Sequence, residues 1–198
     1  MVDRCNRLME AVRVEGVDAV LITSRINRMY FSGFTGSDGI LFISPGRRVL
    51  ITDFRYTIQA NIQCKGTFEV LEASRSAVMD IIKNELSRIG ARHVGFEDAE
   101  LTVRQYNQFK ELGAEFVPCS NFMAKIRVRK DKDEIGHIIK AQNAADAAFA
   151  ELVKRIKPGM SELEVANELE YLMKKHGAED KSFDTIVGSG ENGALCHA

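Results

Sequence analysis

The protein has 198 residues, with 27 lysines and arginines against 28 aspartates and glutamates, so its formal net charge is −1. Hydrophobic residues make up 45% of the chain, and 15 glycines, 3 prolines and 4 cysteines exclude a disordered, a collagen-like or a disulfide-scaffold protein. A charge near zero supplies no general attraction for nucleic acid or anionic membranes, so we expect neither as a partner.

The first residues and the cysteines indicate the cellular compartment. Charges in the stretch 1–7 exclude the apolar core of a signal peptide, and no apolar run reaches the ~20 residues that span a bilayer. We therefore expect a soluble, cytoplasmic protein. The cysteines are 59, 55 and 77 positions apart, which predicts reduced, mostly buried thiols rather than a metal or redox pair: Cys5, Cys64, Cys119 and Cys196.

Up to about Lys125 the sequence alternates between helix and strand signals. Asp3 is the expected N-cap of a first helix that Gly16 closes, and the apolar run 17–22 predicts a strand. Ser24 is expected to begin a second short helix, which ends near Gly33.

The next segments predict a hairpin and then further alternation. Residues 39–43 and 47–52 are strand-like and flank the turn sequence Pro45-Gly46. The remaining expected elements are a helix from about Asp53, a strand at 68–71, a helix at 78–86, a strand at 93–96, a helix after Thr102 with Gln105 in a capping box, and a strand at 116–117. This order predicts an α/β domain with a mixed sheet flanked by helices.

A run of charged residues at 127–134 separates the alternating helix and strand signals from a region of long helical periodicity. We place the expected domain boundary there. Asp131, Asp133 and Glu134 offset its basic residues and suit a helix N-terminus, so we interpret the run as a solvated linker and not as a nucleic-acid patch. The predicted organisation is a domain at 1–126, a linker at 127–131 and a second domain at 132–198.

The second domain is expected to hold two helices and a strand. Apolar residues recur every three or four positions from Ile135 to Ile156, and Pro158-Gly159 is expected to stop this first helix. Ser161 and Glu164 predict a capping box for the second helix. Residues 183–187 are strand-like and precede a glycine-rich tail.

Two glycine clusters are candidates for phosphate-binding loops. Residues 188–193 match G-x-G-x-x-G, but a dinucleotide site also needs a following helix and an acid ~20 residues later, for which five residues leave no room. A glycine turn is the preferred interpretation. Residues 33–39 lack the Gly-Lys-Ser/Thr ending of a P-loop, so we interpret them as a structural loop or, alternatively, as a surface for a substrate or partner subunit.

Four histidines remain to be assigned. His176 lies near Glu179 and Asp180, but Gly177 separates them, so solvated charges at a helix end are preferred over a metal site. His93 and His137 have no partner close in sequence and are interpreted as structural. His197 differs from the other three histidines because it lies just after the glycine-rich tail.

Two groups of segments resemble the creatinase/aminopeptidase P group of pita-bread metallopeptidases, family M24. Residues 27–37 with 50–56 are similar to the N-terminal domain of Xaa-Pro aminopeptidases. Residues 130–135, 156–162 and 182–197 resemble the opening of the catalytic domain. The resemblance covers nearly the whole chain, and it implies a creatinase-like N-terminal domain followed by the truncated opening of a pita-bread domain.

The resemblance implies hydrolysis of the bond before proline in proline-containing peptides. Members of the family use two divalent ions, commonly manganese, held by two Asp, one His and two Glu that follow the glycine-rich stretch and its histidine. This chain ends one residue beyond that histidine, His197. We therefore expect that it binds no metal by itself and is inactive alone, and that it exposes an apolar helix face and a strand edge. Aminopeptidase and dipeptidase specificity both remain open.

The resemblance also assigns roles to individual residues. His197 corresponds to a catalytic histidine that hydrogen-bonds to the reacting peptide group, and Cys196 replaces a frequent proline. Asn27 and Arg28 are candidates for residues next to the substrate, because the N-terminal domain of such enzymes commonly mediates homo-oligomers and can lend its first loops to a neighbouring subunit. The alternative function is a non-catalytic dimerisation or interaction module.

Overall fold

The computed structural model describes residues 2–195, and the chain divides into two compact units between Arg129 and Lys130. None of the helices in the described stretch has the length and apolar character that a bilayer crossing requires.

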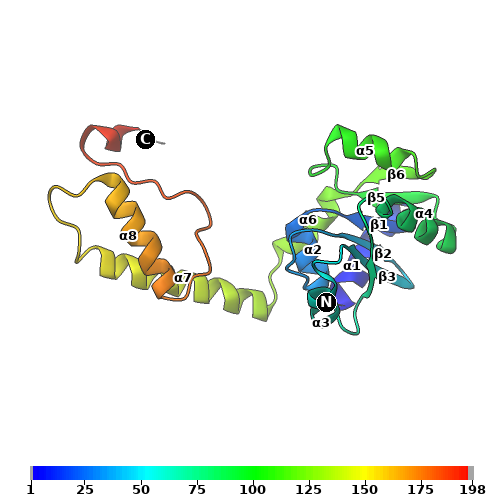
Figure 1. The fold of residues 1–198 in the computed structure, drawn as a ribbon, viewed down its shortest axis with the longest axis horizontal. Coiled ribbons are helices and arrows are strands. Elements are labelled where there is room, and N and C mark those ends of the chain that lie inside the picture. Colours follow the sequence, from blue (N-terminus) through cyan, green and yellow to red (C-terminus); the bar gives the residue numbers. More distant parts are fainter. Residues whose placement is uncertain (1, 196–198) are drawn as a thin grey trace. The chain divides into compact units, whose positions relative to one another are not determined.

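The first unit is built on a six-stranded sheet with the order β4-β3-β2-β1-β5-β6 (Figure 1). Its strands are β1 (Ala19–Ile22), β2 (Ile40–Ser44), β3 (Arg47–Thr52), β4 (Glu69–Glu72), β5 (His93–Phe96) and β6 (Glu115–Pro118). β2 is antiparallel to its neighbours β1 and β3, whereas the other pairs are parallel. The carboxyl ends of five strands therefore meet at one edge of the sheet.

Helices cover both faces of this sheet (Figure 1). One face carries α1 (Val2–Val12), α2 (Arg25–Ser32), α3 (Thr57–Gln63) and α6 (Ser120–Val128), with the short 3-10 helix η1 (Arg13–Glu15) after α1. The other face carries α4 (Val78–Ile89) and α5 (Val103–Lys110). The predicted α/β fold with a mixed sheet flanked by helices is confirmed.

The core follows from the alternation of side chains along the strands. Val20 and Ile22 of β1 point into the cluster beneath α1, α2, α3 and α6, and Ala19 and Leu21 point into the cluster beneath α4 and α5. All four are fully buried, as expected for a central strand covered on both sides.

The structure differs from the predictions at both ends of this unit. α1 begins at Val2, so Asp3 is a helical residue and not the predicted N-cap. α6 was not predicted, because only Met123 and Ile126 are buried between its polar and basic residues. It extends into the expected linker, where Arg127 Nη1 donates to Asn27 Oδ1 at 3.0 Å.

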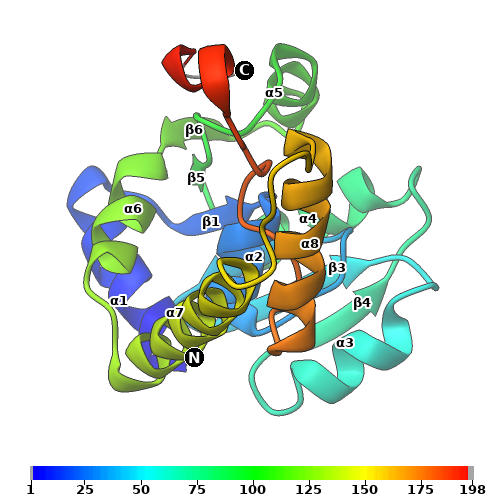
Figure 2. The same ribbon diagram turned by 90° about the vertical axis from the view of Figure 1, so that its left-hand side faces the viewer.

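The second unit contains α7 (Lys132–Leu152) and α8 (Glu162–Lys175), which lie against each other (Figure 2). A predicted capping box begins α8, with Ser161 and Glu164 bonding reciprocally, and a similar box at Asp131 begins α7. α7 ends at Leu152, earlier than the Pro158-Gly159 stop. The buried cluster between the helices comprises Ala148, Leu152 and Leu172.

The predicted strand at 183–187 is wrong. A strand requires a neighbour for its N–H and C=O groups, and the described residues of the second unit include no other strand. Instead, the Thr185 hydroxyl donates to Glu170 Oε1 at 2.8 Å and ties the segment to α8. The short 3-10 helix η2 (Gly190–Ala194) follows.

Candidate functional site

A buried carboxylate organises the turn between β1 and α2. Glu97 directly follows β5 and is 1% exposed. It accepts hydrogen bonds from the backbone N–H and hydroxyl groups of Thr23 and Ser24 and from Asn27 Nδ2, with 2.7 Å to both Ser24 N and Asn27 Nδ2. Because the N-terminus of a helix favours negative charge, Glu97 supplies an internal anion at the start of α2.

Arg28 connects this turn to the loop 33–39. Its side chain is 2% exposed, and Nη1 donates to the carbonyl oxygens of Thr23 at 3.0 Å and Gly39 at 2.8 Å. Nη2 donates to the carbonyl oxygen of Gly36 at 2.8 Å. Burial lowers the pKa of Arg28 below its usual range. The guanidinium therefore holds the turn and the loop together by donating to backbone carbonyl oxygens of both.

The outer side of loop 33–39 is fixed by α3 and the turn before it. Gln63 Oε1 accepts from Thr35 N at 3.0 Å, and Gln59 Nε2 donates to the Thr35 hydroxyl at 2.9 Å. The hydroxyls of Ser37 and Tyr56 lie 2.6 Å apart. The loop is thus ordered from both sides, while the side chains of Thr35, Ser37 and Asp38 remain exposed.

The predicted substrate-adjacent residues are buried within this network. Asn27 is 9% exposed and bridges Glu97 and Arg127, while Arg28 faces backbone oxygens. Arg28 would influence a ligand through the loop that it holds, and Asn27 through the turn that Glu97 organises. His197 and Cys196 lie outside the described residues, and the role of His197 stays a prediction.

A cleft of about 990 Å³ opens beside this network, at the carboxyl ends of β1, β3 and β4. This edge is the usual place for ligands in open α/β sheets. The polar side chains that line the cleft are Thr23, Asp38, Thr52, Asp53, Arg55, Arg75, Thr102, Arg104, Gln105 and Gln108. Arg55, bonded to Asp53, lowers the pKa of that carboxyl.

The described residues do not fit a metal centre. They include no group of three or more His, Cys, Asp and Glu side chains arranged to hold an ion. His176 Nε2 lies 2.9 Å from Glu151 Oε2 instead of joining Glu179 and Asp180. Lys175, His176 and Arg155 lower the pKa of Glu151 to about 2, which marks an ion-pair network at the end of α8.

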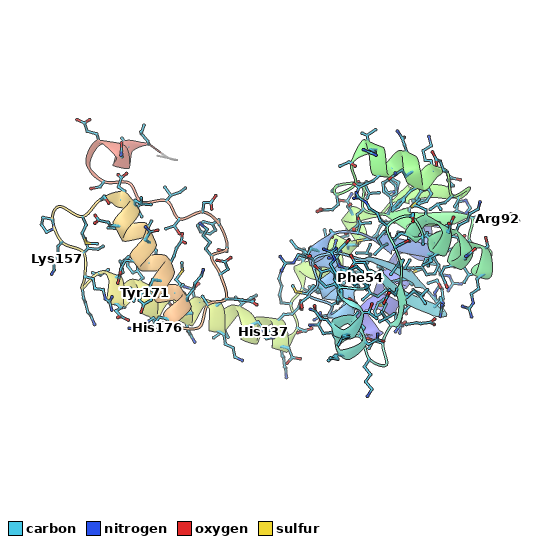
Figure 3. The ribbon with its side chains drawn as sticks, in the orientation of Figure 1. Phe54, Arg92, His137, Lys157, Tyr171 and His176 are labelled. Atoms are coloured by element: carbon cyan, nitrogen blue, oxygen red, sulfur yellow. The ribbon has the colours of Figure 1, made fainter. Side chains whose placement is uncertain are left out.

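The other histidines and the glycine tail have ordinary surroundings. His93 lies 3.5 Å from Glu115 Oε2, and His137 projects from α7 (Figure 3). In the tail, Glu162 Oε1 accepts from Ser189 N at 2.7 Å and from Asn192 Nδ2 at 3.1 Å. A carboxylate thus holds the turn that a pyrophosphate would occupy in a dinucleotide fold.

Three of the four cysteines are described, and Cys5, Cys64 and Cys119 are free and buried as predicted. Burial raises the pKa of Cys5 and Cys119 to about 11. Neutral buried thiols are poor nucleophiles, so these three residues serve packing.

Sequence reasoning missed Glu97 and the arginines of the cleft. The signal for Glu97 was its place directly after a strand that lies parallel to β1, since the carboxyl ends of both strands meet at one edge. The arginines are far apart in the sequence, and no local pattern links them. The fold places them at one cleft.

Comparisons with known proteins identify relatives of both units. The profile of the Creatinase/Prolidase N-terminal domain matches residues 4–129, and that of Metallopeptidase family M24 matches residues 136–198. The uncharacterized peptidase YqhT of Bacillus subtilis is 41% identical over 184 residues, which cover 92% of this chain and 52% of YqhT.

Two solved structures are also similar. The Xaa-Pro dipeptidase from Bacillus anthracis is 41% identical with a TM-score of 0.90, covering 98% of this chain and 55% of that one. The X-Pro aminopeptidase from Thermotoga maritima is 36% identical with a TM-score of 0.86, covering 95% of this chain and 55% of that one. The chain spans about half the length of YqhT and of these two enzymes.

Proposed function

The chain belongs to the creatinase/prolidase and M24 metallopeptidase family, and on this basis we propose that it supplies the N-terminal part of a metal-dependent Xaa-Pro peptidase acting on proline-containing peptides. The observation that carries the proposal is the 41% identity and TM-score of 0.90 to an Xaa-Pro dipeptidase over nearly the whole chain. Both dipeptidase and aminopeptidase activities occur among its relatives.

The proposal gives this chain binding and orienting roles. Divalent ions, commonly manganese in the family, would supply the activated water. The described residues include no group of side chains arranged to hold such ions. We assign to His197 a hydrogen bond to the reacting peptide group, which stabilises charge as the carbonyl is attacked. Arg28 holds loop 33–39, whose exposed Ser37 and Asp38 would face the substrate in a neighbouring subunit, and Asn27 orients the turn before α2 through Glu97.

The apolar surface of the second unit supports the view that it packs against further M24 structure. Several large side chains of α7 are about half exposed, at three- and four-residue spacing, although their periodicity is that of a core face: Ile135, Ile138, Ile139 and Phe149. We infer that residues 1–198 alone are inactive.

An assay of the purified 198-residue chain tests this inference. With added Mn²⁺ and a tripeptide that has proline second, we expect no turnover above a metal-free control. Turnover that depends on Mn²⁺ would contradict the proposed inactivity.

A chimaera tests the role of the chain directly. Residues 1–198 replace the aligned part of the Bacillus anthracis Xaa-Pro dipeptidase, and we expect cleavage before proline to be retained. His197→Ala in this chimaera should lower kcat about 100-fold or more, because it removes a hydrogen bond made to developing charge. The matched control His137→Ala, on exposed α7, should leave kcat unchanged. An inactive but folded chimaera would overturn the proposed function.

A second candidate function, homo-oligomerisation as an interaction module, is favoured by one surface. Phe54, Ile58 and Ile62 are 75%, 78% and 72% exposed and recur every four residues along α3 and the turn before it. Contiguous exposed apolar side chains often mark interfaces. Light scattering should show a dimer or larger species, and Ile58→Gln with Ile62→Gln should shift it toward monomer. A monomer at all concentrations would contradict this candidate.

A further inference from the structure

The cleft at the carboxyl edge of the first unit has an excess of positive charge at its rim. Arg55, Arg75 and Arg104 line it together with Asp38 and Asp53. Arg55 Nη2 lies 2.5 Å from Asp53 Oδ2 and 3.6 Å from Asp38 Oδ2. Arg55 thus offsets one of the two acidic charges, and with Arg75 and Arg104 the five side chains carry a net charge of about +1 at neutral pH.

Arg75 and Arg104 are exposed, and neither guanidinium makes an ion pair or hydrogen bond within the part of the chain that the structure describes. Arg75 lies in the turn before α4, and Arg104 lies in the first turn of α5. Val78 and Met79, at the start of α4, also line the cleft, and no side chain caps that helix at Ala77. The positive ends of two helices thus add to the arginine charges.

Part of the cleft wall is apolar. It includes Ile51, Ala73 and Phe109, which are buried, and the partly buried Val78 and Met79. A volume of about 990 Å³ is at the upper end of the range for small-molecule sites. A ligand that fits must combine a negative group for the rim with an apolar body for the wall.

The structure also indicates where this anion does not bind. The N-terminus of α2, which follows the central strand β1, is already occupied by the Glu97 carboxylate. A phosphate there would be repelled by a buried negative charge, so the anion must lie toward α4 and α5.

We propose that this cleft binds a small organic oxyanion, a phosphate monoester or a carboxylate attached to an apolar or aromatic body, with Arg75 and Arg104 contacting the anion. The site lies in the first unit and does not depend on Xaa-Pro hydrolysis.

Calorimetric titration of the 198-residue chain at low salt distinguishes the two anion classes. The probes are phenyl phosphate, benzoate and inorganic phosphate. We expect one saturable site for phenyl phosphate or benzoate, the tighter of the two identifying the class, and at least tenfold weaker binding of inorganic phosphate. Absence of saturable binding of both aromatic probes would overturn the proposal.

Matched double variants test the location. Arg75→Gln with Arg104→Gln should weaken binding of the better probe at least tenfold. Arg13→Gln with Arg92→Gln removes the same charge from exposed positions outside the cleft, and Arg92 projects from the first unit (Figure 3), so binding should be unchanged. Equal losses in both double variants would overturn the site.

Methyl NMR tests the location of the site in the protein without substitutions. The better probe should shift the methyl resonance of Met79, which lines the cleft, and leave that of Met123, buried in the other core cluster, in place. Saturable binding that leaves Met79 unchanged would assign the probe to another surface and overturn the proposal.

Discussion

Glu97 shows how one side chain can determine a local structure. Its two oxygens accept from five donors, among them the first free N–H groups of the β1–α2 turn. A charged acceptor at such a site is worth more than a neutral one, and a donor placed there would oppose the N–H groups. The carboxylate therefore fixes both the helix start and the orientation of Asn27.

Glu97→Gln tests this role. The amide replaces one oxygen with an NH2 group that faces donors, so we expect the free energy of unfolding to fall by about 2–4 kcal/mol. Urea unfolding monitored by circular dichroism measures the change. Glu100→Gln, an exposed position in the same loop, is the control and should change stability by less than about 0.5 kcal/mol. Equal stability of the two variants would show that the network is not required.

Single residues were the hardest features to predict. The sequence directed attention to Asn27 and Arg28, which the structure buries in the network around Glu97. Glu97 itself is 70 positions from Asn27, and only the parallel pairing of β1 with β5 brings them together. No local pattern encodes a contact of that separation.

At the scale of elements, loop 33–39 depends on a close approach. A Cβ on Gly36 would lie 2.2 Å from Cζ of Phe34, whose ring is fully buried and packs edge-on against Tyr56 with centroids 6.0 Å apart. The ring has little room to move away. Glycine at this position lets the loop fold back over Phe34 and reach Arg28.

Gly36→Ala should therefore destabilise the protein by about 1–3 kcal/mol, as overpacking of a core does. Gly46→Ala is the matched control, since a Cβ there would meet no heavy atom within 4 Å. Thermal unfolding of both variants measures the difference. A Gly36→Ala protein as stable as Gly46→Ala would mean that Phe34 repacks freely.

An ion pair holds α4 to the sheet. Arg47 of β3 bonds to both oxygens of Glu85, at 2.7 and 2.8 Å, and also contacts Glu69 of β4. The side chain of Glu85 is only 8% exposed. Hydrogen bonding to Arg47 lowers the pKa of Glu85 below its ordinary value.

This shift predicts a pH dependence of stability. Because the folded pKa is lowered, the stabilisation is complete above the unfolded pKa of about 4.3 and is lost as the pH falls through the folded value. Glu85→Gln should cost about 2 kcal/mol at pH 7 and less at pH 3, which lies below the unfolded pKa of the carboxyl. Urea unfolding at the two pH values measures both costs, and an equal cost at both would refute the assignment.

Elements with local signals were predicted well. The hairpin around Pro45-Gly46, the capping boxes at Thr102 and Ser161 and the alternation in the first unit are confirmed. α6 lacked such a signal, since its burial depends on packing against α1. The strand at 183–187 failed for the opposite reason, because strand composition was present without a pairing partner in the described second unit.

At the scale of the whole molecule, the two units differ in the size of their cores. The buried cluster of the second unit comprises Ala148, Leu152 and Leu172, whereas two large clusters sandwich the sheet of the first. Since burial of apolar area is the main stabilising contribution, we expect the units to unfold separately.

Hydrogen–deuterium exchange should show this difference. Amides of α7 and α8 are expected to exchange at lower denaturant concentration than those of β1 and β2. Leu172→Ala should accelerate exchange in α7 and α8 and leave the sheet protected. Simultaneous loss of protection in both units would contradict independent unfolding.

The strand order has a consequence for synthesis on the ribosome. β2, β3 and β4 are each added beside the strand made immediately before, and β5 and β6 extend the opposite side from β1. No strand has to insert between two that are already paired. The sheet can therefore grow outward from β1 as the chain emerges, because each newly translated strand can pair with a strand that is then at the edge of the sheet.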